Sequence, residues 1–135
     1  MSLDEADALP MPLILLVEDE VLIREMLVEV LEQAGFSTLV SGDAQEAVLL
    51  FDTNGAQIRG LVTDINLDCG MDGWELACAL REQVGDLPVV YVSGASGHEW
   101  ASRGVPNSLM ITKPFAPAQV VVALSSLMVA TDSMS

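Results

Sequence analysis

Four apolar runs of this chain each end in polar side chains of a kind that takes part in phosphoryl chemistry. Lys113, the only lysine, follows one run, and the hydroxyl residue Ser93 closes another. Carboxylates follow the other two runs, Glu18 and Asp19 after the first and Asp64 after a later one. A carboxylate can act as a nucleophile toward phosphorus, and Mg²⁺ prefers oxygen ligands. These residue types predict a cation-dependent phosphoryl site on an aspartate.

The elements that would position these side chains alternate between two periodicities. Continuous aliphatic runs are typical of strands buried on both faces, and we expect strands at 13–17, 36–40, 61–63, 88–92 and 109–112. Helical spacing of apolar residues predicts helices at 21–34, 44–51, 74–84 and 117–130, with a short helix within 94–104. This alternation indicates an α/β fold, a doubly wound five-stranded parallel sheet with helices on both faces. The carboxyl ends of the strands would meet at one edge, where such sheets bind ligands.

The length of 135 residues fits one domain with a single core, and the sequence contains no internal repeat. We expect a flexible N-terminal lead at 1–12, a domain at 13–131 and a C-terminal tail at 132–135.

Twenty acidic residues against five basic ones give a formal net charge of −15. Nucleic-acid binding needs clustered Lys and Arg, so no nucleic-acid partner is expected, whereas a basic protein partner or simple solubility fits the charge. Cys69 and Cys78 match no metal-ligand or redox spacing. The apolar stretch Leu9–Val17 is too short to span a bilayer, and no secretion signal precedes it. We therefore expect a soluble protein of a reducing cytoplasm, without membrane contact.

The acidic triplet 18–20 has two interpretations. Acids at the start of a helix are also favoured by the helix dipole, so N-capping alone would account for them. Asp64 favours the site interpretation, because it would emerge at the same sheet edge. Lys113 would otherwise form a surface salt bridge, and Ser93 would otherwise belong to a turn with Gly94. No glycine-rich phosphate-binding pattern occurs, which argues against dinucleotides and P-loop nucleotides.

Four short motifs, in this order, resemble those of the receiver domain of two-component response regulators. They are Leu15–Glu20, Val62–Asn66, Val90–Ala95 and Thr112–Phe115. The resemblance covers residues 13 to 130 and implies a flavodoxin-like receiver fold with strand order 2-1-3-4-5.

The resemblance also implies a role for each site residue. Asp64 would be the phosphoacceptor, and Ser93 and Lys113 would contact the phosphoryl group. The Lys113–Pro114 peptide bond would be cis, as in the family. The implied protein ligands of Mg²⁺ are Glu18, Asp19, Asp64 and the backbone carbonyl of Asn66.

The same resemblance implies partners and output. The phosphoryl donor would be a histidine kinase or a histidine phosphotransfer protein, and the domain would assist only its own phosphorylation and dephosphorylation. Because the sequence ends soon after the last helix, we expect a single-domain response regulator that signals through contacts with a protein effector. Met110 departs from the family, which carries an aromatic switch residue three positions before the lysine. A flexible thioether cannot reproduce the two positions of such a ring.

The last helix lacks charge on both faces. No charged residue occurs between Pro114 and Thr131, and Val122 and Val129 fall on the expected outer face with Gln119. A solvated helix face normally carries charges. We therefore expect this face to contact another protein, by homodimerisation or effector docking, although a merely uncharged surface is the alternative.

Two other functions compete with the receiver interpretation. An Mg²⁺-dependent phosphatase with an aspartyl nucleophile would carry an Asp-x-Asp pair after its first strand. Asp64-Ile65-Asn66 lacks the second acid and lies on the third expected strand. A non-phosphorylated interaction module on the same fold is the other alternative, and it leaves the acids and Lys113 unexplained.

Overall fold

The computed structural model describes residues 11–67, 70–94 and 99–134, the last four of them by their backbone alone. Within these residues, strands and helices alternate along the chain. The strands are β1 (Leu13–Val17), β2 (Ser37–Ser41), β3 (Ile58–Asp64), β4 (Val89–Ser93) and β5 (Ser108–Thr112). The helices are α2 (Val21–Gln33), α3 (Ala44–Asn54), α4 (Gly73–Gln83), α5 (Trp100–Arg103) and α6 (Pro117–Met134).

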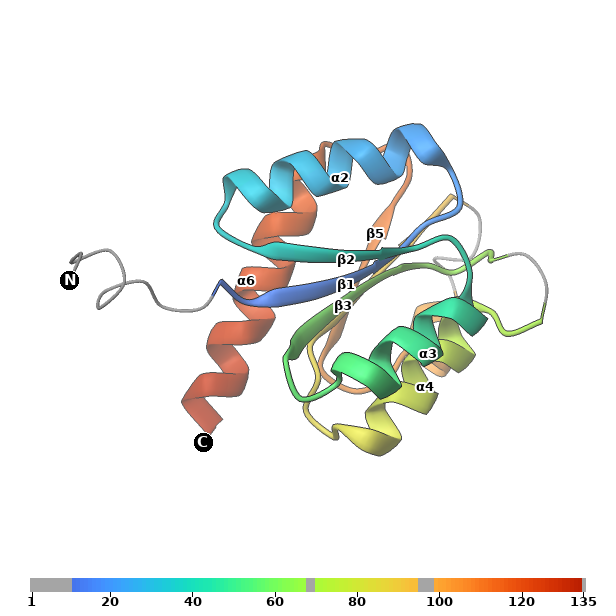
Figure 1. The fold of residues 1–135 in the computed structure, drawn as a ribbon, viewed down its shortest axis with the longest axis vertical. Helices are drawn as coiled ribbons and strands as arrows, with labels where there is room; N and C mark the ends of the chain where they lie inside the picture. The colour runs from blue at the N-terminus through green and yellow to red at the C-terminus, as the bar shows by residue number, and fades with distance from the viewer. Residues whose placement is uncertain (1–10, 68–69, 95–98, 135) are drawn as a thin grey trace.

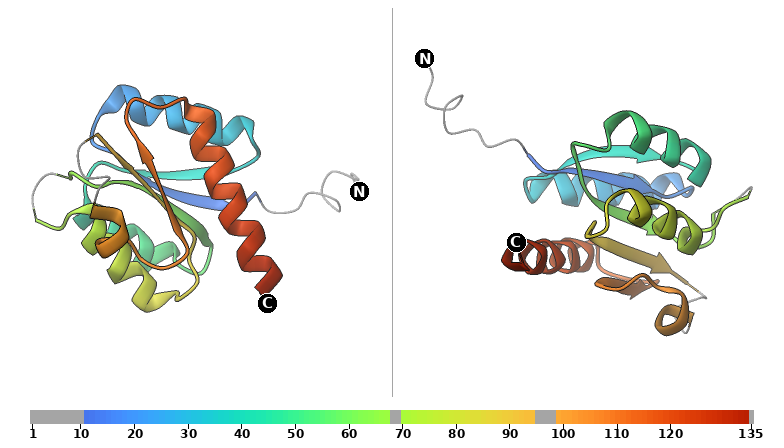
Figure 2. Two further views of the ribbon diagram at one scale, coloured as in Figure 1. Left: turned by 180° about the vertical axis from the view of Figure 1, so that it is seen from behind. Right: turned by 90° about the horizontal axis from the view of Figure 1, so that it is seen from below.

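All strand pairs are parallel, and the sheet has the order β2-β1-β3-β4-β5. The predicted doubly wound sheet and its order 2-1-3-4-5 are therefore confirmed. Figure 1 shows α2 and α6 over one face of the sheet and α3 and α4 over the other, and Figure 2 shows the same layers from two further sides.

Alternate strand residues build two separate cores. In β1, Leu15 and Val17 pack toward α3 and α4, whereas Ile14 and Leu16 pack toward α2 and α6. The α3–α4 core also holds the aromatic residues Phe51, Trp74 and Tyr91. The α2–α6 core is mostly aliphatic and includes Leu27, Leu31, Val120 and Leu124. Since most residues of the three central strands β1, β3 and β4 are buried, these strands read largely as apolar runs in the sequence.

Several boundaries differ from the prediction by one to four residues, and three of them illustrate the differences. β3 begins at Ile58 rather than at Leu61, because exposed Arg59 and small Gly60 interrupt the apolar pattern without interrupting the strand. β2 lies one residue later than expected, at Ser37–Ser41. α6 continues through Met134 into the predicted tail at 132–135, where neither glycine nor proline stops it. Most of the predicted lead, residues 1–10, lies outside the described residues.

Among the residues that the structure describes, no helix combines the length and the apolar character that crossing a bilayer requires.

Candidate functional site

The strand ends place the predicted site residues in a row along the carboxyl edge of the sheet. Val17 is in register with Thr63, so the residues that follow them, Glu18 and Asp64, lie side by side. In the same way Asp64 is in register with Val92, the residue before Ser93. Ser93 is in register with Thr112, the residue before Lys113. The backbone N–H of Lys113 donates to the Ser93 carbonyl at 2.8 Å, which fixes the start of the lysine against β4.

Lys113 reaches back across this row to three carboxylates. Its Nζ lies 3.0 Å from Asp64 Oδ2, 3.3 Å from Glu20 Oε1 and 3.5 Å from Glu18 Oε1. The side chain is only 18% exposed. The Lys113–Pro114 bond is cis, as the family resemblance implied. Lys113 therefore does not form an isolated surface salt bridge.

Glu18 is the most constrained acid of the group. Its side chain is 1% exposed, and Oε1 has no hydrogen-bond partner. Burial raises the pKa of Glu18 to about 7, and the neighbouring Asp64 carboxylate adds to the rise. Burial alone would lower the pKa of Lys113, but the hydrogen bond and charge of Asp64 and the charge of Glu18 raise it. Glu18 thus carries a charge that its surroundings only partly compensate.

Three carboxylates in this row form a cluster suited to a divalent cation. Oxygen atoms of Glu18, Glu20 and Asp64, here called the acidic cluster, lie within 4.8 Å of one another. Glu18 Oε1 is buried and has no hydrogen-bond partner, with the Lys113 ammonium 3.5 Å away, so it is free to coordinate a cation. A set of oxygen ligands is what Mg²⁺ prefers. The side chains therefore fit the predicted metal.

The remaining predicted residues lie near the acidic cluster without belonging to it. Asp19 is half-buried and falls outside the acidic cluster, so its role as a ligand stays a prediction. Asn66 is exposed, and its backbone N–H donates to Asp64 Oδ1 at 3.1 Å, which orients the aspartate. Its carbonyl as a ligand also stays a prediction. Ser93 is fully buried beside Asp64 and Lys113 in the row. His98, a further polar residue of the loop after β4, lies outside the described residues.

Two residues that sequence analysis did not assign belong to this region. Glu20 joins the acidic cluster, and the only signal for it was its place in the triplet 18–20. Tyr91 is fully buried in β4, directly beside Met110 of β5. Its hydroxyl accepts a hydrogen bond from Val105 N at 3.1 Å, and its ring centroid lies 4.6 Å from that of Trp74. An aromatic ring therefore lies beside position 110, on the neighbouring strand.

Gly73, the first residue of α4, lies against the backbone of Asp64 and Ile65 at the end of β3. A Cβ at this position would overlap the Asp64 carbonyl oxygen and lie 2.7 Å from Ile65 Cα. The Gly73 N–H also donates to the Ile65 carbonyl at 2.9 Å. Only the absence of a side chain allows α4 to start so close to the end of β3.

Replacing Gly73 by Ala is therefore expected to lower the free energy of unfolding by about 1–3 kcal/mol, because backbone atoms must move to admit the methyl group. Urea denaturation followed by circular dichroism measures the change. Gly85→Ala is the matched control, since a Cβ there meets nothing within 4 Å. Equal stability of the two variants would contradict this account of Gly73.

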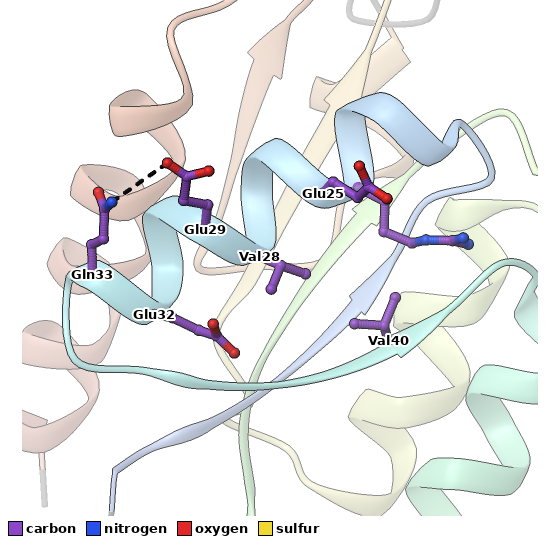
Figure 3. Close-up of a pocket in the computed structure, with 7 residues that line it drawn as sticks. Glu25, Val28, Glu29, Glu32, Gln33 and Val40 are labelled. Atoms are coloured by element: carbon purple, nitrogen blue, oxygen red, sulfur yellow. Dashed lines mark hydrogen bonds between the residues drawn. The ribbon is translucent and has the colours of Figure 1, made fainter.

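A separate groove lies between α2 and the edge strand β2. Figure 3 shows Glu25, Glu29 and Glu32 along α2, with Val28 and Val40 between the helix and the strand. None of the acidic cluster lines this groove. Its acidic residues all belong to α2, and Lys113 is not among the residues that line it.

Comparisons with known proteins identify a family whose fold agrees with the one described above. The family model of the response regulator receiver domain matches residues 14–125. The chain is 33% identical over 118 residues to the phosphate regulon transcriptional regulatory protein PhoB of Escherichia coli, covering 85% of this chain and 51% of PhoB. It is 31% identical over 114 residues to the transcriptional regulatory protein YvrH of Bacillus subtilis, covering 82% of this chain and 46% of YvrH. The chain thus spans about half the length of the curated relatives it matches.

Solved structures agree with this assignment. The crystal structure of a response regulator receiver protein from Sinorhizobium medicae has 38% sequence identity and a TM-score of 0.86. The match covers 90% of this chain and 97% of that chain. The chemotaxis protein CheY4 of Vibrio cholerae has 25% identity and a TM-score of 0.77, with 87% of this chain and 99% of that chain covered.

Proposed function

This chain belongs to the response regulator receiver family, and from that premise we propose that Asp64 accepts a phosphoryl group in an Mg²⁺-dependent reaction. A receiver domain is a signalling domain rather than a conventional enzyme. The observation that carries the proposal is the contact of 3.0 Å between Asp64 and the single lysine, inside a cluster of carboxylates at the ligand-binding edge of the sheet. An aspartate held in this way has a nucleophilic oxygen, and the Lys113 ammonium beside it can pair with phosphoryl oxygens.

The proposed donor is the phosphohistidine of a histidine kinase or of a histidine phosphotransfer protein. An Asp64 oxygen forms the new bond to phosphorus while the phosphorus–nitrogen bond breaks, and the leaving imidazole keeps the electron pair and takes up a proton. Lys113 pairs with one phosphoryl oxygen, and the Ser93 hydroxyl donates to another. Mg²⁺, held by Glu18 and Asp64 with Asp19 and the Asn66 carbonyl as further proposed ligands, would neutralise charge on the phosphoryl group. With such a donor, the proposed location of the reaction is the cytoplasm.

An apolar patch beside the site supports a protein donor. Val21, Leu22 and Met26 begin α2 directly after the acidic cluster, and all three are exposed, Leu22 by 77%. Exposed apolar side chains grouped beside a reactive residue are typical of a docking surface. A helical protein carrying phosphohistidine would bury this patch when it delivers the phosphoryl group.

Output is proposed to run through β5 and the elements next to it. Lys113 directly follows β5, and its backbone N–H donates a hydrogen bond to the carbonyl of Ser93 in β4. A dianionic group on Asp64 draws both side chains toward it, so the ends of β4 and β5 move together. Protein contacts that depend on this movement would carry the signal to an effector.

We further propose that α6 supplies such a contact, with a second copy of this chain as partner. Val122 and Val129 are each 65% exposed on the uncharged outer face. Val122 also lines a hollow with Leu109 and Met110 of β5. In a chain of net charge −15, an uncharged face is the surface on which two copies repel each other least.

Val122→Glu is therefore expected to weaken self-association at least ten-fold, because each dimer would bury two unpaired charges. Sedimentation equilibrium with and without beryllofluoride and Mg²⁺ gives the dissociation constants. Leu49→Glu is the matched control, since Leu49 is 63% exposed on α3, on the other side of the sheet. A wild-type chain that stays monomeric under both conditions would refute the proposal for α6.

The experiment that tests the proposed function is phosphate incorporation from acetyl phosphate in the presence and absence of Mg²⁺. We expect one phosphoryl group per chain, Mg²⁺-dependent, labile to hydroxylamine and mapped by mass spectrometry to the peptide that contains Asp64. Steady turnover of p-nitrophenyl phosphate instead would favour the aspartyl phosphatase. No incorporation at all would favour the non-phosphorylated interaction module.

A further inference from the structure

Glu20 holds the N-cap position of α2 but does not cap the helix with its side chain. The N-cap residues of α3 and α4, Asp43 and Asp72, do cap their helices with their side chains. Each accepts a hydrogen bond from the backbone N–H three residues on. The Glu20 carboxylate instead accepts a hydrogen bond from Lys113 Nζ at 3.3 Å. The N-terminus of α2 therefore lacks the stabilisation that a side-chain cap provides. The Glu20 carboxylate is hydrogen-bonded to Lys113 instead.

Phosphorylation of Asp64 would affect the three carboxylates around Lys113 differently. Asp64 becomes the phosphorylated residue and loses its free carboxylate. Glu18 is buried, and its Oε1, which has no hydrogen-bond partner, fits a divalent cation. Glu20 is 60% exposed at the rim of the site and keeps its charge. It is the one anion of the acidic cluster that remains available to Lys113.

Resting on the proposed function, we propose that Glu20 is a specificity-determining residue that competes with the phosphoryl group for Lys113. It thereby slows the modification of Asp64 by small anionic phosphodonors. Two effects of Glu20 act in the same direction. Its ion pair with Lys113 must loosen before the ammonium reaches a phosphoryl oxygen, and its exposed charge repels an approaching anion. A protein donor can offset the second effect with its own basic residues, whereas a small anion cannot.

The first test compares Glu20→Gln with Glu25→Gln for labelling of Asp64 by acetyl phosphate at saturating Mg²⁺. In this reaction the bond between phosphorus and the acetyl oxygen breaks, acetate leaves, and the bond to Asp64 forms. Glu25 is the matched control because it is an exposed acid of the same helix that lines the separate groove (Figure 3). Both variants lose one negative charge. We expect labelling of Glu20→Gln to be two- to five-fold faster than that of the control, as for an exposed ion pair of about this strength.

Salt dependence separates this electrostatic effect from a change of shape. The advantage of Glu20→Gln should shrink by at least half when ionic strength rises from about 0.05 to about 0.5 M, because exposed charges are then screened. Equal rates for the two glutamine variants would overturn the proposal. A slower rate for Glu20→Gln, together with weaker Mg²⁺ affinity, would overturn it as well and would make Glu20 a ligand of the cation.

A second test needs neither donor nor metal. Lys113 is the only lysine, so nitrogen-15 lysine labelling gives a single side-chain ammonium signal. Its relaxation should show greater side-chain mobility in Glu20→Gln than in the wild type and in Glu25→Gln. Unchanged mobility would refute the contact. If the wild type takes no phosphoryl group on Asp64, the proposed function fails, whereas this measurement still decides whether Glu20 holds Lys113.

Discussion

Asp64→Asn is expected to take up no measurable phosphate from acetyl phosphate with Mg²⁺. The amide has no anionic oxygen to form the acyl phosphate, and it offers the cation a weaker ligand. It also removes one of the charges that hold Lys113, whose Nζ lies 3.0 Å from Asp64 Oδ2. Because the loss is one of chemistry rather than of affinity, higher donor concentrations should not restore the label. Intact-protein mass spectrometry over a donor titration measures it.

The matched control for this experiment is Asp86→Asn, which changes an exposed aspartate in the loop before β4. It should label at the wild-type rate. Circular dichroism of both variants should match the wild type, since Asp64 lies at the end of β3 and not within either core. A phosphoryl group carried by Asp64→Asn at the wild-type rate would mean that another residue is the acceptor.

The stability of the metal-free chain is expected to fall as pH rises through the range in which Glu18 ionises. Glu18 has a pKa of about 7 in the folded chain against 4.5 for an ordinary glutamate, so the folded state binds this proton more tightly. The stabilisation is complete below pH 4.5 and is lost as pH rises through 7. Between pH 5 and pH 8 the contribution amounts to about 2–3 kcal/mol.

Glu18→Gln isolates this contribution, because the amide has no proton to lose. The unfolding free energy of the variant minus that of the wild type should rise by about 2–3 kcal/mol from pH 5 to pH 8 in EDTA. Urea denaturation at each pH provides the values. Added Mg²⁺ should stabilise the wild type at pH 8 and shrink the difference, since a cation favours the ionised acid. Parallel pH profiles in EDTA would show that Glu18 titrates as an ordinary glutamate.

The sequence was sufficient for the order of the elements and for the core of the site. Buried parallel strands read as apolar runs, so the residue after each run marks the carboxyl edge of the sheet, as for Glu18, Asp64 and Lys113. Elements with a mixed pattern were less visible. Arg59 and Gly60 hid the first half of β3 because one is exposed and the other lacks a side chain.

The sequence did not show which of several neighbouring side chains would reach the site. In the triplet 18–20, the turn after β1 brings Glu20 into the acidic cluster and leaves Asp19 outside it. That difference depends on backbone angles at the start of α2 rather than on residue type. The position of Tyr91 beside Met110 likewise follows from the register of β4 and β5, which the apolar pattern alone does not determine.

The division of the interior into two cores has a practical consequence for spectroscopy. Both tryptophans and the only tyrosine lie on the α3–α4 side. The Trp74 ring is tilted against the Tyr91 ring, and the Trp100 indole donates to Ser108 Oγ beside Val105 of the same core. Tryptophan and tyrosine fluorescence will therefore record events in that half of the molecule. A rearrangement confined to α2 and α6, where the aromatic side chains are Phe36 and Phe115, would leave this emission unchanged, so an unchanged emission spectrum is no sign that the opposite half stayed still.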